Sequence, residues 1–175
     1  MANTYTLIAS STVGSGGAAN IEFTSIPGTY TDLAIFLSAR CSGSGANGWE
    51  NGSITFNNST SGYSGILLVG RGDLAPVSIS NGTSAIDYGW YASDSGTTAN
   101  TFASNFIYIP NYTSSNNKSV SSDIAQETNA ARAIMGFNAG LWSNSAAITS
   151  VKLTNASPQT FVQYSTAYLY GIKNS

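Results

Sequence analysis

The sequence has no histidine, a single cysteine (Cys41) and charged side chains on only 8% of its 175 residues. Without histidine, the usual Ser-His-Asp triad, imidazole proton relays and most catalytic zinc sites are excluded. A lone cysteine cannot form an internal disulfide. We therefore expect Cys41 to be a small residue at the end of a strand, in a protein made in a reducing compartment, and we expect no enzymatic activity.

Basic residues are also scarce. Six lysines and arginines occur singly along a chain of net charge −2, so they cannot build the basic stripe that nucleic-acid binding needs. No apolar run approaches the roughly 20 residues of a membrane span, and the first residues lack the basic start and apolar stretch of a secretory signal. We expect a soluble protein, made in a cytoplasm, that binds neither nucleic acid nor membrane.

The eight acidic residues offer little for catalysis or metal binding. Two carboxylates suffice for glycoside hydrolysis, but on one strand Asp123 and Glu127 would lie about 13–17 Å apart, beyond the separation of a glycosidase pair. A helix there would bring them close. No loop has the acidic spacing of a calcium site. We predict no metal and no cofactor, and we expect the two carboxylates to be solvated surface groups.

The polar residues that are present are mostly uncharged. Ser, Thr and Asn make up roughly a third of the chain, and with Gly they favour turns over helix interiors, because their side chains compete for backbone hydrogen bonds. Aromatic residues make up 11% and hydrophobic residues 42%, too many for a disordered chain. The composition therefore predicts a folded protein of strands and loops.

Apolar alternation with a period of two is the main pattern, and it is clearest over residues 31–40, where Leu33, Ile35 and Leu37 share one face. Similar patterns predict strands over residues 5–13, 19–23, 53–56, 66–69, 85–91, 105–109, 118–126, 131–141, 148–153 and 161–172. Residues 121–133 also fit a short helix, but Thr128 and Asn129 favour a hairpin turn. We predict one domain over residues 1–175. Its fold class is all-β, a two-sheet antiparallel sandwich with jelly-roll or related Greek-key connectivity.

Two short motifs do not need a functional explanation. Arg71-Gly72-Asp73 matches an adhesion tripeptide, yet its position after the strand at residues 66–69 predicts a turn. Triplets such as Asn51-Gly52-Ser53 match glycosylation acceptors, but they are expected by chance when Asn, Ser and Thr are this abundant.

Aromatic residues are the candidates for an interface with a second subunit or a partner. On the last predicted strand Tyr164, Tyr168 and Tyr170 share one face, and Tyr suits an interface because its hydroxyl can stay hydrated at the rim. Core packing is an equal alternative for these tyrosines. Trp49 and Trp90 lie beside Gly-rich loops, where an exposed indole could anchor a partner or stack on a sugar, although we favour simple packing within the loops for both.

Eight segments carry a resemblance that covers nearly the whole chain and is weakest over residues 41–100. They are Tyr5-Thr6-Leu7-Ile8, Val13-Gly14-Ser15-Gly16-Gly17-Ala18, Ile21-Glu22-Phe23-Thr24-Ser25-Ile26-Pro27, Tyr30-Thr31-Asp32-Leu33, Ile107-Tyr108-Ile109-Pro110-Asn111-Tyr112, Gly140-Leu141-Trp142, Ala147-Ile148-Thr149-Ser150 and Phe161-Val162-Gln163-Tyr164-Ser165-Thr166. In these segments the chain resembles small virion proteins of tailed bacteriophages of aquatic bacteria and cyanobacteria. The resemblance implies a structural protein of a phage particle, made in the bacterial host, and it implies no catalytic residues.

Together these observations favour a capsid decoration (cement) protein, a homotrimeric subunit that binds where major capsid proteins meet and stabilises the head. A nearly uncharged surface associates through shape, hydrogen bonds and apolar patches, which depend less on salt than ion pairs do. The alternative is a tail-fibre or tail-tip module that binds a host-surface polysaccharide, with Trp49, Trp90 or loop tyrosines as stacking platforms.

Overall fold

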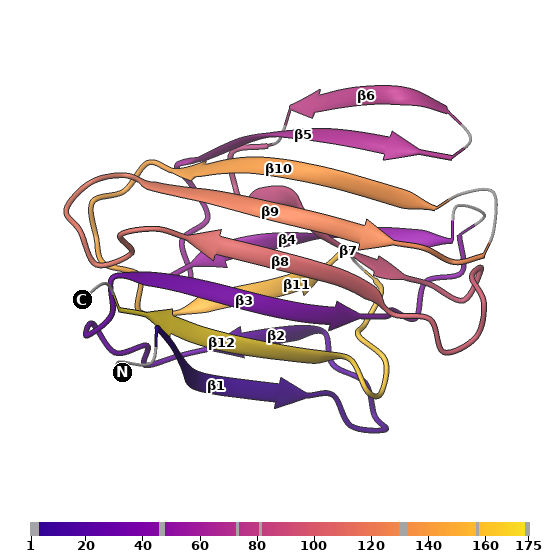
Figure 1. The fold of residues 1–175 in the computed structure, drawn as a ribbon, viewed down its shortest axis with the longest axis horizontal. Helices are drawn as coiled ribbons and strands as arrows, with labels where there is room; N and C mark the ends of the chain where they lie inside the picture. Colours follow the sequence, from indigo (N-terminus) through magenta and orange to yellow (C-terminus); the bar gives the residue numbers. More distant parts are fainter. Residues whose placement is uncertain are drawn as a thin grey trace.

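A computed structural model describes residues 4–45, 48–72, 74–80, 82–129, 133–156 and 158–173. Over these residues the chain forms strands and no helix, so no helix there could span a membrane (Figure 1). The strands are β1 (Tyr5–Thr12), β2 (Asn20–Phe23), β3 (Asp32–Ala39), β4 (Trp49–Phe56), β5 (Tyr63–Arg71), β6 (Leu74–Ser80), β7 (Ile86–Ser93), β8 (Ala103–Ile109), β9 (Lys118–Gln126), β10 (Ile134–Trp142), β11 (Val151–Asn155) and β12 (Thr166–Ile172).

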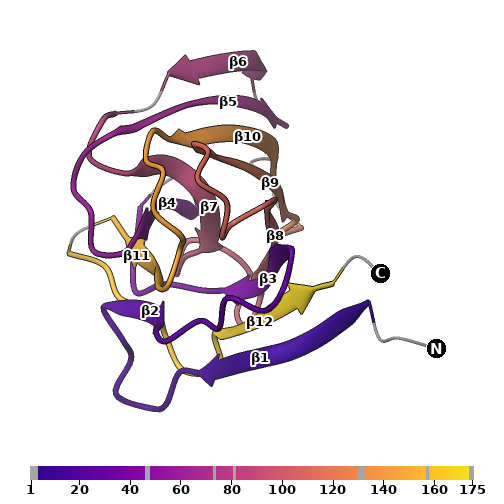
Figure 2. The same ribbon diagram turned by 90° about the vertical axis from the view of Figure 1, so that its left-hand side faces the viewer.

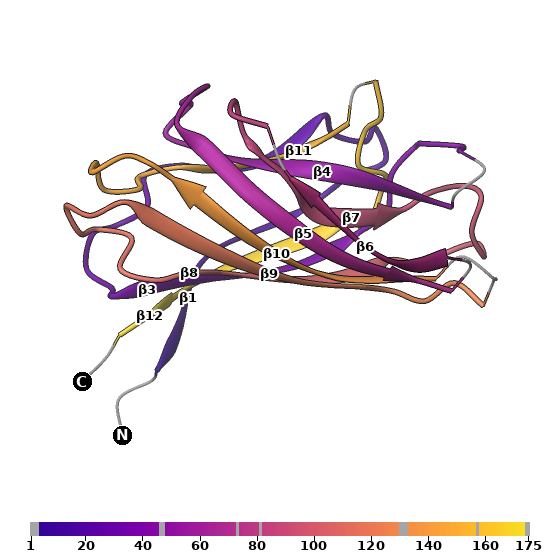
Figure 3. The same cartoon turned by 90° about the horizontal axis from the view of Figure 1, so that it is seen from above.

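The strands form two antiparallel sheets that pack face to face (Figures 2 and 3). The larger sheet has eight strands in the order β1-β12-β3-β8-β9-β10-β5-β6, and the smaller has four in the order β2-β11-β4-β7. β1 pairs with β12 at one edge of the larger sheet, which places Tyr5 at the start of β1 beside Ile172 at the end of β12 (Figure 1). The predicted two-sheet antiparallel sandwich is confirmed, whereas its jelly-roll connectivity stays a prediction.

The core lies between the sheets. It is formed by the side chains on one face of each strand, where buried and exposed positions alternate. β9 and β10 alternate buried and exposed side chains almost from end to end, as expected for strands with one face in the core. The largest buried side chains include three aromatics that pack together, Phe56, Tyr63 and Trp142, with ring centroids 5.6–6.3 Å apart. The inner faces of the two sheets thereby bury most of the large apolar residues.

In the described part of the ambiguous segment 121–133, residues 121–126 belong to strand β9 and none is helical. β9 pairs with β10 without a register shift, from Lys118 opposite Trp142 to Gln126 opposite Ile134. The turn between them includes Thr128 and Asn129, and Asn129 has a positive φ of 55°. The hairpin prediction is therefore confirmed, although residues 130–132 lie outside the described residues.

One strand was missed by the sequence pattern. β6 pairs with β5 at the end of the larger sheet, and its sequence Leu-Ala-Pro-Val-Ser-Ile-Ser includes a proline, a residue that weakens the pattern of a strand. An edge strand tolerates proline because one row of its backbone groups has no neighbour to bond. The turn predicted after residues 66–69 begins later than expected, because Gly70 and Arg71 still belong to β5 and only Gly72 lies in a turn; Asp73 lies outside the described residues.

Candidate interaction surface

The outer face of the eight-stranded sheet carries a row of mostly large apolar side chains that crosses six neighbouring strands and the edge strand β6. Following the register from strand to strand, the row runs through Tyr168, Phe36, Phe106, Asp123, Phe137, Leu68 and Ser78. Directly paired residues lie on the same side of an antiparallel sheet. We call this surface, together with the neighbouring Tyr5, Leu7, Ile66, Met135 and Tyr170, the outer face.

Many of these side chains are well exposed. Phe137 and Met135 have 57% and 60% of their surface accessible, and Leu68 has 54%. Exposed apolar residues scattered singly are ordinary, but a contiguous patch on a soluble domain marks an interaction site. The outer face is therefore the strongest candidate site for binding another macromolecule.

Aromatic side chains on the outer face contact one another across four strands. Phe36 lies 5.0 Å from Phe106 and 5.7 Å from Tyr170, and Tyr170 lies 6.1 Å from Tyr5, all between ring centroids. Such contacts hold the rings in defined positions. A partner therefore meets a surface that is already ordered, which lowers the entropy cost of association.

Two hollows flank Phe137 on this face. One, of about 480 Å³, is lined by Ile66, Leu68 and Asp123 among others, and the other, of about 280 Å³, is lined by Phe106, Asp123 and Met135 among others. Asp123 lies in both hollows, directly opposite Phe106 and Phe137 in the register. The surface thus offers a ridge with a depression on each side, a shape that apolar knobs of a partner can fill.

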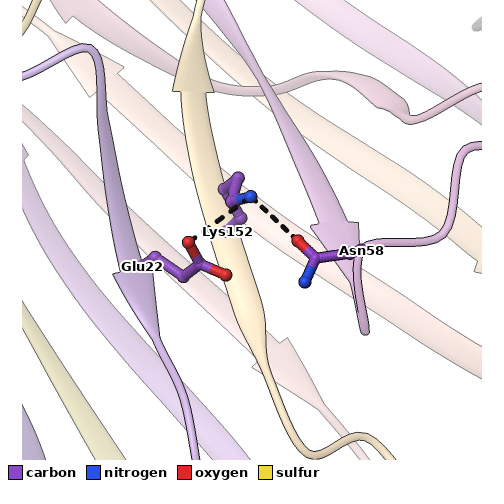
Figure 4. Close-up of polar contacts among 3 residues, drawn as sticks. All are labelled: Glu22, Asn58 and Lys152. Atoms are coloured by element: carbon purple, nitrogen blue, oxygen red, sulfur yellow. Dashed lines mark hydrogen bonds and ion pairs between the residues drawn. The ribbon is translucent and has the colours of Figure 1, made fainter.

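The outer face of the smaller sheet has the opposite character. Lys152 on β11 forms an ion pair of 3.4 Å with Glu22 on β2 and donates a hydrogen bond of 2.8 Å to Asn58 Oδ1 (Figure 4). Beside this group, Ser53 is paired with Thr154 in the register. Because charged and hydroxyl side chains are well solvated, this sheet can face water while the other outer face is buried in a contact.

The three predicted interface tyrosines do not share one stripe. Tyr168 and Tyr170 lie on β12 and contribute to the outer face, Tyr168 with 40% of its surface exposed. Tyr164 lies before β12 in a turn, with a positive φ of 72° and 68% of its surface exposed. The expected strand over residues 161–172 begins only at Thr166, so the parity argument fails for Tyr164.

Trp90 is a correction to the sequence interpretation, because its side chain has no exposed surface. Its indole stacks on Phe161 at 5.0 Å between centroids, and its Nε1 donates to the Ser53 carbonyl. The space exists because Gly52 lies opposite it, where a Cβ would come within 2.0 Å of the indole ring. Trp90 is therefore a core residue and contacts no partner from this position.

Trp49 is half-buried and lies at the opening between the two sheets. Its ring packs against Tyr91 at 5.2 Å, and the Arg71 guanidinium lies 5.7 Å above it. Trp49 does not belong to the outer face, because β4 is a strand of the smaller sheet. The structure therefore brings only Tyr168 and Tyr170 together among the predicted site residues, while Tyr164, Trp90 and Trp49 each lie elsewhere.

The residues with catalytic potential are dispersed. Asp123 points outward on β9, while Glu127 follows the strand and accepts hydrogen bonds from the backbone N–H groups of Thr128 and Asn129. Burial raises the pKa of the Cys41 thiol to about 11, which makes it a poor nucleophile. Within the described ranges, no group of three or more Cys, Asp and Glu side chains is placed to hold a metal ion.

Sequence reasoning missed most of the outer face, including Phe36, Phe106, Leu68 and Phe137. A signal was present: in each of these strands an apolar residue occupies a position where alternation calls for a polar one. For example, Phe36 lies between Ile35 and Leu37, which are both buried. Apolar residues on both faces of a strand indicate either burial on both sides or an unpartnered contact surface.

Comparisons with known proteins add little to this geometry. No protein-family model matches the chain, and no curated protein matches it. Among solved structures, it is similar to one described as HCR/D-Sa-GBL1/C, with 9% identity over 89% of this chain and 38% of that chain and a TM-score of 0.35.

Two further structures show the same level of likeness. Scytalido-glutamic peptidase is 16% identical over 85% of this chain and 72% of its own, with a TM-score of 0.28. A fructofuranosidase from Schwanniomyces occidentalis is 5% identical over 99% of this chain and 35% of its own, with a TM-score of 0.31. Scores this low carry no argument about function.

Proposed function

We propose that this chain is a non-enzymatic structural protein of a bacteriophage particle. In this proposal it is a capsid decoration protein that docks its outer face on the lattice of major capsid proteins. The observation that carries the binding role is the exposed apolar row from Tyr168 to Leu68. The assignment to a phage particle is supported by the resemblance to virion proteins of tailed bacteriophages. A homotrimer is the assembly that we expect on the lattice.

The size of the outer face suits a stable contact. Eight of its large apolar residues have 40–60% of their surface exposed: Tyr5, Leu7, Phe36, Ile66, Leu68, Met135, Phe137 and Tyr168. Side chains of this size and exposure each present on the order of 100 Å², so together they approach the about 800 Å² that each partner buries in a standard interface. The patch is large enough to be the centre of such an interface.

The charge distribution fits a contact that forms through shape and apolar burial. Asp123 is the one charged residue in the row that crosses the outer face. The charged pair Lys152 and Glu22 lies on the other sheet. Binding of this kind depends weakly on ionic strength, because few exposed charges are involved. A capsid subunit with an apolar, weakly charged docking site is the complementary partner.

The test is the copy number of the protein relative to the major capsid protein in purified particles, measured by quantitative mass spectrometry. Near-stoichiometric abundance supports a decoration protein spread over the lattice. A few dozen copies per particle would contradict it and favour the tail-fibre or tail-tip alternative. Absence from the particle would overturn the virion assignment altogether.

A further inference from the structure

A second site lies at the opening between the two sheets, away from the row that defines the outer face. It is a cleft of about 260 Å³ whose lining residues come from β4, β5, β6, β7 and β10. Small-molecule pockets typically occupy about 300–1,000 Å³, so a cleft just below this range suits a single six-membered ring. Its position between sheet edges leaves one side open to solvent.

The floor and walls of the cleft are apolar and aromatic. Val69, Ile134 and Tyr91 are buried at its base, and the half-buried rings of Trp49 and Tyr88 lie at its sides. Tyr88 stacks on Tyr91 at 6.4 Å and Trp49 packs against Tyr91 at 5.2 Å, between ring centroids. Three aromatic rings therefore meet in one small cavity.

Polar groups of both charges line the same cleft. Arg71 supplies guanidinium donors, Glu50 a carboxylate acceptor, and Asn51 an amide that can donate and accept. One cation and one anion balance each other, so the cleft carries no net charge to attract an ion. Aromatic rings beside a few such groups fit a ligand with an apolar face and several hydroxyls.

The backbone around Tyr88 is strained in a way that positions its ring. Tyr88 has a φ of 55°, which is unusual for a bulky residue. The register between β4 and β7 shifts here, from Gly52 opposite Trp90 to Ile54 opposite Ile86, so β7 bulges at residues 87–89. Bulges of this kind redirect a side chain, and they concentrate at functional sites.

A buried side chain from the other sheet holds this bulge in place. Asn138 on β10 donates from Nδ2 to the carbonyls of Asp87 and Tyr88, both at 3.1 Å. Asn138 has only 2% of its surface exposed. The bulge is thus fixed from the core side, while the Tyr88 ring faces the cleft.

We propose that this cleft binds one neutral hexopyranose unit of a glycan. The apolar C–H face of the sugar packs on Trp49 and Tyr88, and its hydroxyls bond to Arg71, Glu50 and Asn51. This inference goes beyond the proposed docking of the outer face and does not depend on it, since the two sites lie on different parts of the molecule. A single ring in such a cleft is expected to bind with a Kd on the order of 1–10 mM.

The test titrates the isolated full-length protein with three methyl glycosides, those of β-D-glucopyranose, β-D-galactopyranose and α-D-mannopyranose, followed by two-dimensional amide NMR. We expect saturable shifts for at least one of them at residues that line the cleft. If none of the three gives saturable shifts, or if the shifts lie outside the cleft, the proposal is wrong.

Two variants and a matched control connect binding to the cleft. Tyr88→Asn removes the ring but keeps a residue type that tolerates positive φ, and Trp49→Ala removes the second ring; each should weaken binding at least about tenfold. Tyr164→Asn is the control, because Tyr164 is also a tyrosine with positive φ and lies outside the cleft. Unchanged affinity in a folded Tyr88→Asn protein would overturn the proposal. Loss of affinity in Tyr164→Asn as well would do the same.

Discussion

At the scale of single residues, the absence of one side chain sets the position of another. Gly52 leaves room for the Trp90 indole, and a Cβ there would lie 2.0 Å from the ring. We expect Gly52→Ala to destabilise the protein by about 1–3 kcal/mol, because the indole or the strand must shift in a packed core. Urea unfolding measures this change. A variant as stable as the wild type would show that Trp90 can relocate freely.

Cys41 gives a prediction about chemical reactivity. The side chain has 1% of its surface exposed, and burial raises its pKa to about 11. The thiol should therefore react slowly with a thiol reagent at pH 8 in the folded protein and at the normal rate in urea. The comparison of the two rates, followed by absorbance, checks this. Fast reaction of the native protein would mean that the strand end at Cys41 opens readily.

Glu50 gives a prediction about pH. Burial, with a further contribution from Asp94, raises its pKa above the ordinary value of 4.5, so the folded state binds the proton more tightly than the unfolded state. The stability that protonation contributes is full below pH 4.5 and is lost as pH rises through the raised pKa.

The expected outcome is that Glu50→Gln is more stable than the wild type at pH 7, because the amide removes the cost of the buried charge. The difference should shrink as pH falls through the raised pKa of Glu50 and reach its minimum below 4.5, where the carboxyl is neutral in the folded and the unfolded wild type. Thermal unfolding of both proteins across this range measures it. A difference that does not vary with pH would rule out the charge as its cause.

At the scale of the element, β7 depends on a contact from the other sheet. Asn138 Nδ2 bonds to two carbonyls of the β7 bulge. Asn138→Ala leaves both without this donor, and we expect a loss of about 1–3 kcal/mol in the free energy of unfolding. Ser119→Ala, an exposed position on β9, is the control and should change little. Equal stability of the two variants would mean that the bulge holds without Asn138.

The strands themselves show how far alternation can be trusted. Residues 118–126 were predicted as a strand with the boundaries that β9 has, because one face of that strand is buried along its whole length. The pattern failed at β6, an edge strand with Pro76, and at Tyr164, which lies in a turn. In both places the backbone conformation depends on a neighbouring segment that is distant in the sequence, so the local pattern does not reveal it.

At the scale of the whole molecule, the larger sheet has an apolar outer face and the smaller sheet a polar one. Variants on the two faces therefore test which of them docks on the capsid. Leu68→Ser with Phe137→Ser, a pair opposite each other in the register, should cost less than about 1 kcal/mol per site, because both side chains are already more than half exposed. The double variant should nevertheless lose binding to particles that lack the protein.

Co-sedimentation with such particles measures the loss, and light scattering reports the oligomeric state in parallel. The matched control is Ser53→Ala with Thr154→Ala, a paired position on the smaller sheet, which should bind like the wild type. Full binding by the Leu68 and Phe137 variant would show that another surface makes the contact.

What the sequence determined by itself is the class of the fold and the chemistry that is missing. Period-two alternation follows from the geometry of a strand, so it is visible locally, and the lack of histidine needs no structure to interpret. The tertiary structure alone decided which apolar residues meet. Trp90 is buried because Gly52 lies opposite it on another strand, and Phe36, Phe106 and Phe137 form one row because β3, β8, β9 and β10 are neighbours. Contacts between distant segments depend on strand order and register, which no local pattern encodes.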